Sequence, residues 1–367
     1  MNQMKQEKVK KMKKNNLYVD INVIQTVPSS NINRDDTGAP KSGIYGGVTR
    51  ARVSSQSWKR AVRLAFRDML PDEEVGLRTK KIVGLVAEEI RQLDPSISDN
   101  DAQKKATAAL TNAGLKIKDP KVGTDALLLI SRRQAQALAE LAVAGEKDKK
   151  AYRAAFVEHP SVDMALFGRM VAGEPSLSYD AACQVAHAVS THAVETEYDY
   201  FTAVDDLSIE DNAGAGHLGV SEFNSSTLYR YATVNCRELF RSLGKRTPEA
   251  VKAFAEAFIT CMPDGKKNSY ANGTLPAGVY IAVRTDRPVS LAPAFEKAAQ
   301  PSDRGFQAPS MERLVEYAKE VTDYVDEPAV SFVTGAGLAD LGEPKKLKTV
   351  LDELEAVITD LLPDGGC

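Results

Sequence analysis

The chain has 367 residues, 43% of them hydrophobic, and a formal net charge of -3, as in ordinary globular proteins of one or two domains. No apolar run reaches roughly 18 residues and none follows the basic N-terminus, so we expect no membrane span, no signal peptide and a cytoplasmic location. The four scattered cysteines (Cys183, Cys236, Cys261 and Cys367) form no CxxC pair, which favours reduced thiols over disulfides or a zinc site.

The charge is unevenly distributed along the sequence. Residues 1–67 contain 14 Lys and Arg against 4 Asp and Glu, a balance of +10, which leaves -13 for the remainder. Phosphate binding depends on local charge, so this segment keeps a polyanionic partner possible. Part of the excess lies in residues 1–16, for which we expect a basic, disordered tail.

The N-terminal half is predicted to be one strand followed by helices. Alternating apolar residues indicate a half-buried strand over 17–27, and a loop rich in Pro, Gly, Ser and Asn follows. A helix is predicted over 54–70, capped by Ser54 or Ser55. From 71 to about 160 the sequence is Ala-rich and helical, apart from a short strand at 127–130. We interpret this region as a helical insertion.

The C-terminal half mixes both kinds of element. A helix is predicted over 180–193, and two strand-like segments then flank a glycine-rich stretch, which is typical of a hairpin or extended arm. The remaining predicted elements are a helix at 248–262, a strand at 279–284, a helix near 310–324, a strand near 329–333 and a helix at 344–362. This order predicts an α+β fold with a small antiparallel sheet, compatible with an RNA-recognition-type core.

The loop and helix of residues 31–67 carry the sharpest functional signal. Glycines allow close backbone approach, and a helix N-terminus adds a positive dipole, so this mixture suits an extended phosphate backbone held without sequence reading. An ordinary basic surface remains the alternative. The cations are Arg34, Lys41, Arg50, Arg52, Lys59, Arg60 and Arg63, among the neutral donors Asn33, Ser54 and Gln56.

Signals for catalysis are weak. No Walker loop or GxGxxG fingerprint is present, and His187 and His192 are five residues apart, a poor spacing for a metal pair on a helix. The acid pairs Asp35–Asp36 and Asp205–Asp206 could bind magnesium and cut a phosphodiester, or could cap turns. We expect no cofactor, no metal and no catalytic residue.

Several motifs in order resemble one family. They are Asn33-Arg34-Asp35-Asp36, Lys41, Gly46-Gly47, the run from Arg50 to Arg60, Gly168-Arg169-Met170, the run from Phe201 to Leu207, His217-Leu218-Gly219, and Tyr229-Arg230-Tyr231. In this order and spacing the chain is similar to the CasC-type backbone subunit of type I-E CRISPR Cascade, from about residue 17 to 300.

The resemblance implies a hand-like fold of α+β class: a modified RNA-recognition (ferredoxin-like) palm with a helical fingers insertion and a β-hairpin thumb. The fingers would be residues 71–164 and the thumb 200–225. The palm would comprise residues 17–70, 165–199 and 226–367.

Particular residues acquire roles through the same resemblance. Arg169 and Met170 would bracket a displaced nucleotide, and Thr202, His217 and Leu218 would belong to the thumb, with Leu218 as a wedge. Val48 and Thr49 stand where relatives often carry basic residues, which predicts a weaker grip there. The residues that would hold phosphates are Arg34, Lys41, Ser54, Gln56, Lys59 and Arg63.

The function implied is non-enzymatic binding of CRISPR RNA. Copies would polymerise along the guide spacer, hold phosphates and leave bases free to pair with target DNA. Other Cascade subunits and, indirectly, a recruited helicase-nuclease would be partners, with no membrane involved. The alternatives are a metal-dependent RNase that uses Asp35 or Asp36, and a general single-strand RNA chaperone.

Overall fold

The computed structural model describes residues 16–119, 123–171, 173–203 and 217–363, without the side chains of residues 217 and 218. The chain divides into two compact units. The first takes its described residues from Met1–Val62, Val185–Thr233 and Phe254–Leu354, and the second from Arg63–Gln184, Val234–Ala253 and Glu355–Cys367. The basic tail predicted over 1–16 lies outside the described residues except for Asn16.

A sheet forms the first unit, with β1 (Tyr18–Ser30) near its middle, in the order β11-β10-β1-β9-β7-β3-β2. On one side of β1 lie β10 (Gly278–Arg284) and β11 (Val330–Thr334), paired antiparallel. On the other side follow β9 (His217–Asn235), β7 (Ala188–Ser190), β3 (Val48–Val53) and β2 (Ser42–Tyr45), also antiparallel from β9 outward. The predicted α+β class with an antiparallel sheet is confirmed.

Both faces of β1 are buried, whereas the alternation in sequence predicts a half-buried strand. Val19, Ile21 and Val23 fill one face, but Asp20 and Asn22 on the other are also buried. Tyr231 Oη donates to Asp20 Oδ1 at 2.9 Å, and Tyr229 Oη donates to Asn22 Oδ1 at 2.7 Å. Residues of α11 (Gln307–Glu320) belong to the same apolar cluster as Tyr229 and Tyr231, which explains why solvent is excluded from this face.

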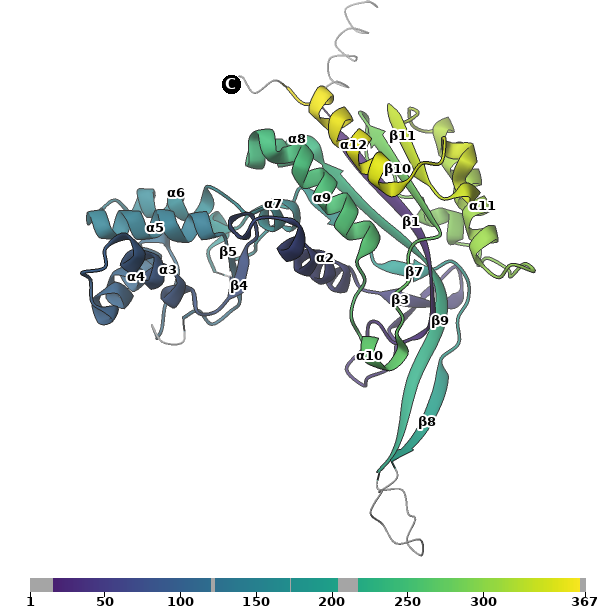
Figure 1. Ribbon diagram of the computed structural model, residues 1–367, viewed down its shortest axis with the longest axis horizontal. Helices are drawn as coiled ribbons and strands as arrows, with labels where there is room; N and C mark the ends of the chain where they lie inside the picture. The colour runs from purple at the N-terminus through teal and green to yellow at the C-terminus, as the bar shows by residue number, and fades with distance from the viewer. Residues whose placement is uncertain (1–15, 120–122, 172, 204–216, 364–367) are drawn as a thin grey trace, which may run out of the picture. The chain divides into compact units, whose positions relative to one another are not determined.

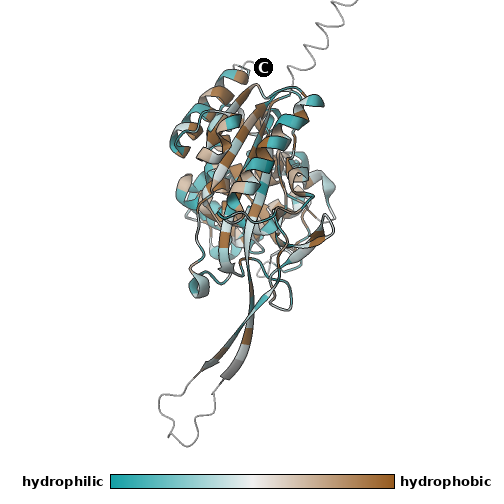
Figure 2. Ribbon diagram, turned by 90° about the vertical axis from the view of Figure 1, so that its right-hand side faces the viewer, coloured by the Kyte–Doolittle hydropathy of each residue, from teal (hydrophilic) through white to brown (hydrophobic). Residues whose placement is uncertain are grey.

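Helices complete the first unit. α10 (Lys267–Tyr270) is a single turn, and Trp58 of α2 (Ser55–Met69) packs edge-on to Phe258 of α9 (Thr247–Thr260). The helix α12 (Leu347–Leu361), like α2 and α9, contributes residues to both units. In Figure 2 the strands of the sheet carry mainly apolar residues, and the helices alternate apolar with polar ones, as expected for helices with one covered face.

The second unit is mainly helical (Figure 1). Its helices are α3 (Ile82–Leu93), α4 (Asp99–Ala113), α5 (Arg132–Ala144), α6 (Lys149–Val157), α7 (Val162–Phe167) and α8 (Cys236–Leu243), with a two-stranded sheet of β4 (Leu77–Thr79) and β5 (Leu128–Ile130). The buried face of α4 carries alanines at helical spacing: Ala102, Ala106, Ala109 and Ala113. Their small side chains let the neighbouring helices approach closely. Ser131 and Gln134 form a capping box that begins α5.

Some predicted elements differ from the structure. The helix predicted over 180–193 is wrong: this segment forms β6 (Cys183–Val185) and β7, and β7 pairs with both β3 and β9. Sheet pairing thus overrides the helix propensity of its alanines. The strands β2, β3 and β4 and the helices α7, α8 and α10 were not predicted. The other helices and strands predicted from sequence are present within a few residues of the expected positions.

The burial of Asp20 leads to a pH-dependent prediction. Burial raises the pKa of Asp20 from 3.8 to about 6, despite hydrogen bonds from Val289 N and Tyr231 Oη that oppose the shift. The folded state therefore binds this proton more tightly than the unfolded state. The stability it contributes is complete below about pH 4 and is lost as the pH rises through 6.

We expect Asp20→Asn to remove this dependence. Between pH 5 and 7 the wild type should lose about 1 kcal/mol of unfolding free energy relative to the variant, because other groups titrate equally in both. Urea unfolding at several pH values measures the difference. Parallel pH profiles for the two proteins would contradict the predicted protonation.

Candidate nucleic-acid interface

The loop between β1 and β2 is folded on itself by hydrogen bonds. Lys41 N donates to Asn33 O at 2.9 Å, and Asp35 N donates to Ala39 O at 3.0 Å. Asp35 Oδ1 accepts from Thr37 N, Thr37 Oγ1 and Ala39 N at 2.7–3.1 Å. The hydrogen bond from the Thr37 side chain is the main cause that lowers the pKa of Asp35. The carboxylate thus builds the turn, and Arg34 is exposed on it.

The same loop positions the N-terminus of α2. Ser54 N donates to Asn33 Oδ1 at 2.8 Å, and Ser57 N donates to Ser54 Oγ at 3.3 Å, so Ser54 is the helix cap. Asn33 and Ser54, both predicted to contact RNA, therefore join the loop to the helix. Gln56 and Arg60 are exposed beyond this cap, and Lys59 is partly buried. Arg60 lies 3.9 Å from the Asp264 carboxylate, an exposed pair of little energetic value.

A cationic cluster lies beside the start of α2. Arg52 Nη1 is 3.4 Å from His187 Nδ1, and Ser55 N donates to the same nitrogen at 3.3 Å. Burial, then the charges of Arg52 and Lys41, lower the pKa of His187, which places these three groups in one electrostatic neighbourhood. We call Lys41, Arg52 and His187 the cationic cluster. Lys41 and Arg52 are positively charged, and the nearby N-terminus of α2 adds a positive dipole. Both features attract the phosphates of a nucleic-acid backbone.

Sequence reasoning missed His187 in this role, because it considered the residue only as half of a metal pair on a helix. The register β3–β7 brings it here, since Arg52 pairs with Val189 across the two strands. Two further cations, Lys266 and Lys267, lie in the loop whose Asp264 is near Arg60. Only the Gly-Lys-Lys-Asn-Ser run of this loop could have pointed to them.

Arg50 does not belong to this interface. Its side chain is completely buried, and its guanidinium donates to the carbonyls of Tyr45, Ser190, Phe295 and Glu296 at 2.9–3.2 Å. All of these partners are backbone acceptors of the first unit. Arg50 therefore holds the fold together, and we remove it from the predicted RNA-binding set.

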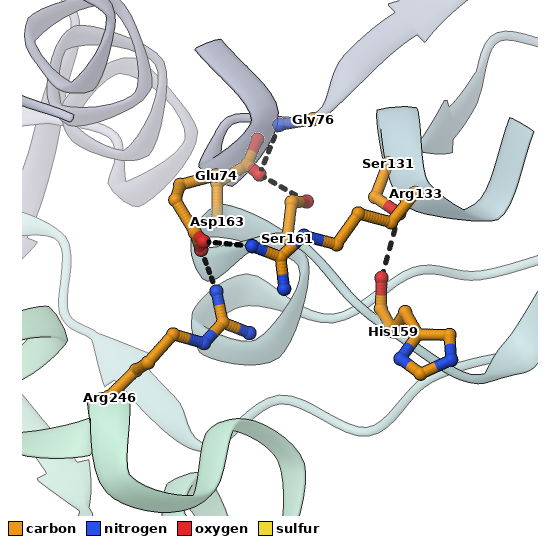
Figure 3. Close-up of polar contacts among 8 residues, drawn as sticks. All are labelled: Glu74, Gly76, Ser131, Arg133, His159, Ser161, Asp163 and Arg246. Atoms are coloured by element: carbon orange, nitrogen blue, oxygen red, sulfur yellow. Dashed lines mark hydrogen bonds and ion pairs between the residues drawn. The ribbon is translucent and has the colours of Figure 1, made fainter. Parts of the chain in front are cut away.

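Arg63 and Arg169 are likewise engaged within the second unit. Arg63 Nε donates to Asp163 Oδ2 at 2.7 Å, and Asp163 is fully buried. Figure 3 shows the same carboxylate accepting from Gly76 N and Ser161 Oγ, next to Glu74 between Arg133 and Arg246. The ion pair of Arg63 thus closes a buried polar network, contrary to the phosphate contact expected from sequence.

Arg169 donates to the carbonyls of Leu177, Leu129 and Phe156 and stacks 4.2 Å from the Phe156 ring centroid. Burial lowers its pKa to about 10. Its neighbour Met170 is 85% exposed, so the two predicted partners have different environments. Of the two side chains, only the Met170 thioether is exposed enough to contact a ligand.

The predicted thumb contains an antiparallel hairpin. β8 (Glu197–Ala203) pairs with β9 from Phe201↔Gly219 to Glu197↔Phe223, and Thr202 is opposite Leu218. The hairpin extends away from the sheet of the first unit (Figure 1). Residues 204–216 of the predicted thumb, with Asp205 and Asp206, lie outside the described residues, as do the side chains of His217 and Leu218. Tyr198, Tyr200 and Val220 are exposed apolar residues on it.

Two absences apply to the part of the chain that the structure describes. Its helices include none that is long and apolar enough to cross a membrane. Within those residues, no three His, Cys, Asp or Glu side chains form a group that could hold a metal ion.

Comparison with solved structures identifies the class of protein that shares this fold. A chain of a "CRISPR RNA-guided surveillance complex, pre-nicking" is 35% identical, with a TM-score of 0.79, and the match covers 93% of this chain and all of that chain. A chain of another "CRISPR RNA-guided surveillance complex" is 34% identical, with a TM-score of 0.62, covering 93% and 99%. No curated protein sequence matches. The chain belongs to the family of CT1975-like proteins, which it matches over residues 19–359.

Proposed function

We propose that this chain is a CRISPR RNA-binding subunit of a Cascade-type surveillance complex. The observation that carries the proposal is the cationic cluster at the start of α2, found in a chain whose fold matches subunits of such complexes along almost its whole length. Lys41, Arg52 and the exposed Arg34 offer charge. The helix N-terminus and Gln56 offer neutral donors. Such a surface binds phosphate without reading bases.

We further propose that the protein is the backbone subunit of a type I-E complex, of the CasC type. The sheet of the first unit would be an RNA-recognition-like palm, α3–α6 the fingers and the β8–β9 hairpin the thumb. Copies would stack along the guide spacer in the cytoplasm, each thumb meeting the next copy, with bases left to pair with target DNA. Other subunits would flank this filament, and a recruited helicase-nuclease would act on the DNA.

We propose a non-enzymatic role. In the RNase alternative Asp35 or Asp36 would hold a metal ion. Asp35 Oδ1 already accepts three hydrogen bonds within its own turn, which supports a structural function for that carboxylate. Asp36 is exposed on the same loop.

The test is to purify the protein with its co-expressed partners and sequence the RNA that accompanies it. We expect spacer-containing RNA of uniform length, because copies along a guide protect a defined stretch. Mixed cellular RNA without defined stoichiometry would support the chaperone alternative instead. Magnesium and a complementary RNA are then added to the same complex. Cleavage that disappears in Asp35→Ala would establish the RNase.

A further inference from the structure

A small niche with both polar and apolar walls lies beside the cationic cluster, in the first unit. It is half-open and is lined by the 30–33 segment, β3 and β9, with Lys41 and Arg52 among its lining residues. Its volume is about 10 Å³, room for one water molecule or one hydroxyl group. A base or a phosphate does not fit, so any ligand group that enters must be a single small polar one.

Asn31, one of the residues that line this niche, carries a buried hydrogen-bond acceptor without a partner in the described ranges. The residue is 1% exposed, and its Nδ2 donates to the carbonyls of Gly38 and Glu222, both at 2.9 Å. Because both partners are acceptors, they fix the amide orientation and leave Oδ1 turned away from them. Asn31 Oδ1 has no donor in the described part of the chain. A buried acceptor of this kind costs free energy until a donor reaches it.

Two residues of β9 complete the niche. Asn224 and Ser226 alternate along the strand, so their side chains share one face, and they are 8% and 6% exposed. An amide and a hydroxyl can each donate or accept. The group that fits here must donate to Asn31 Oδ1 and exchange a second hydrogen bond with β9, which is the chemistry of an alcohol.

We infer that this niche receives the ribose 2′-hydroxyl of a nucleotide whose phosphate lies at Lys41 and Arg52. The inference rests on the proposed RNA-binding function and adds to it the means of distinguishing RNA from DNA. The 2′-hydroxyl is both donor and acceptor, and it is the group that a DNA strand lacks. Phosphate contacts alone would bind either strand, because both have the same charged backbone.

A deoxy strand offers no donor to Asn31 Oδ1, which finds none among the described residues. We expect the wild-type protein to bind a short single-stranded RNA about tenfold more tightly than the DNA of the same sequence. Fluorescence anisotropy at one fixed salt concentration measures both affinities. A third strand with 2′-fluoro sugars keeps the sugar pucker of RNA but has no donor. We expect it to bind like DNA.

Variants separate the niche from the rest of the interface. Ser226→Val fills the space with methyl groups, and Asn224→Ala removes an amide without touching Asn31, whose own substitution would disturb the Gly38 and Glu222 contacts. Both should lower RNA affinity to the level of DNA and leave DNA affinity unchanged. Ser225→Val, on the other face of the same strand, is the matched control and should retain the tenfold preference.

The outcomes distinguish the two hypotheses. Equal affinity of the wild type for RNA and DNA would overturn the assignment of the niche to the 2′-hydroxyl and leave the proposed RNA binding intact. So would a 2′-fluoro strand that binds like RNA, or a preference unchanged in Ser226→Val and Asn224→Ala, as expected if a resident water fills the niche. Absence of binding to every strand would overturn the proposed function together with this inference.

Discussion

Reversing Lys41 and Lys59 to glutamate is expected to abolish RNA-dependent assembly and to leave the monomer folded. Both lysines lie at the loop and helix that carry the candidate interface, and Lys41 shares the electrostatic neighbourhood of Arg52 and His187. Two reversals place negative charge against the phosphates, so we expect RNA binding at least about 100-fold weaker at low salt. Size-exclusion chromatography with and without guide RNA measures assembly, and circular dichroism measures folding.

The matched control is Lys346→Glu with Lys348→Glu, which makes the same charge change at exposed positions near the start of α12. It should assemble normally. In single-lysine variants that keep some affinity, the slope of log K against log salt should fall by about one for each phosphate that is no longer neutralised. Normal assembly of the Lys41 and Lys59 variant would reject the interface.

Arg63→Glu is expected to unfold the second unit rather than to impair RNA contact. The substitution removes the cation from the fully buried Asp163 and adds a second carboxylate beside it. Leaving one partner of a buried ion pair uncompensated costs about 3–5 kcal/mol, and Gly76 and Ser161 cannot neutralise the charge. Thermal and urea unfolding should show the loss directly.

Arg67→Glu, one turn further along α2 and exposed, is the control and should change stability by less than about 0.5 kcal/mol. A melting temperature equal to wild type in Arg63→Glu would show that the ion pair contributes nothing. The same reasoning explains why Arg63 must be left out of any charge-reversal test of RNA binding: a triple variant that includes it would fail for reasons of folding.

Much of the fold could be predicted because local patterns and packing agree. The apolar period of α12 and the alanine face of α4 are visible in the sequence, and both helices are present. The segment 183–190 was mispredicted because its strand state depends on pairing with β3 and β9, far away in the chain. Asp20 looked solvent-facing because nothing local reveals that α11 covers the second face of β1.

The candidate site was predictable as a region and less so residue by residue. A count of cations between 31 and 67 locates the interface, but composition does not distinguish an arginine that meets solvent from one that satisfies buried carbonyls. Arg50 and Arg52 are two positions apart and point to the same face by strand period, yet only Arg50 is enclosed, by Ser190 and the 295–296 backbone. Conversely, His187 joins the cluster only through the strand register.

The exposed face of the β8–β9 hairpin has a consequence for how the protein behaves in isolation. Tyr198, Tyr200 and Val220 present apolar surface on this two-stranded ribbon. Such ribbons adhere to one another when nothing covers them. Purified chains with nothing over this face are therefore expected to adhere through the ribbon as their concentration rises.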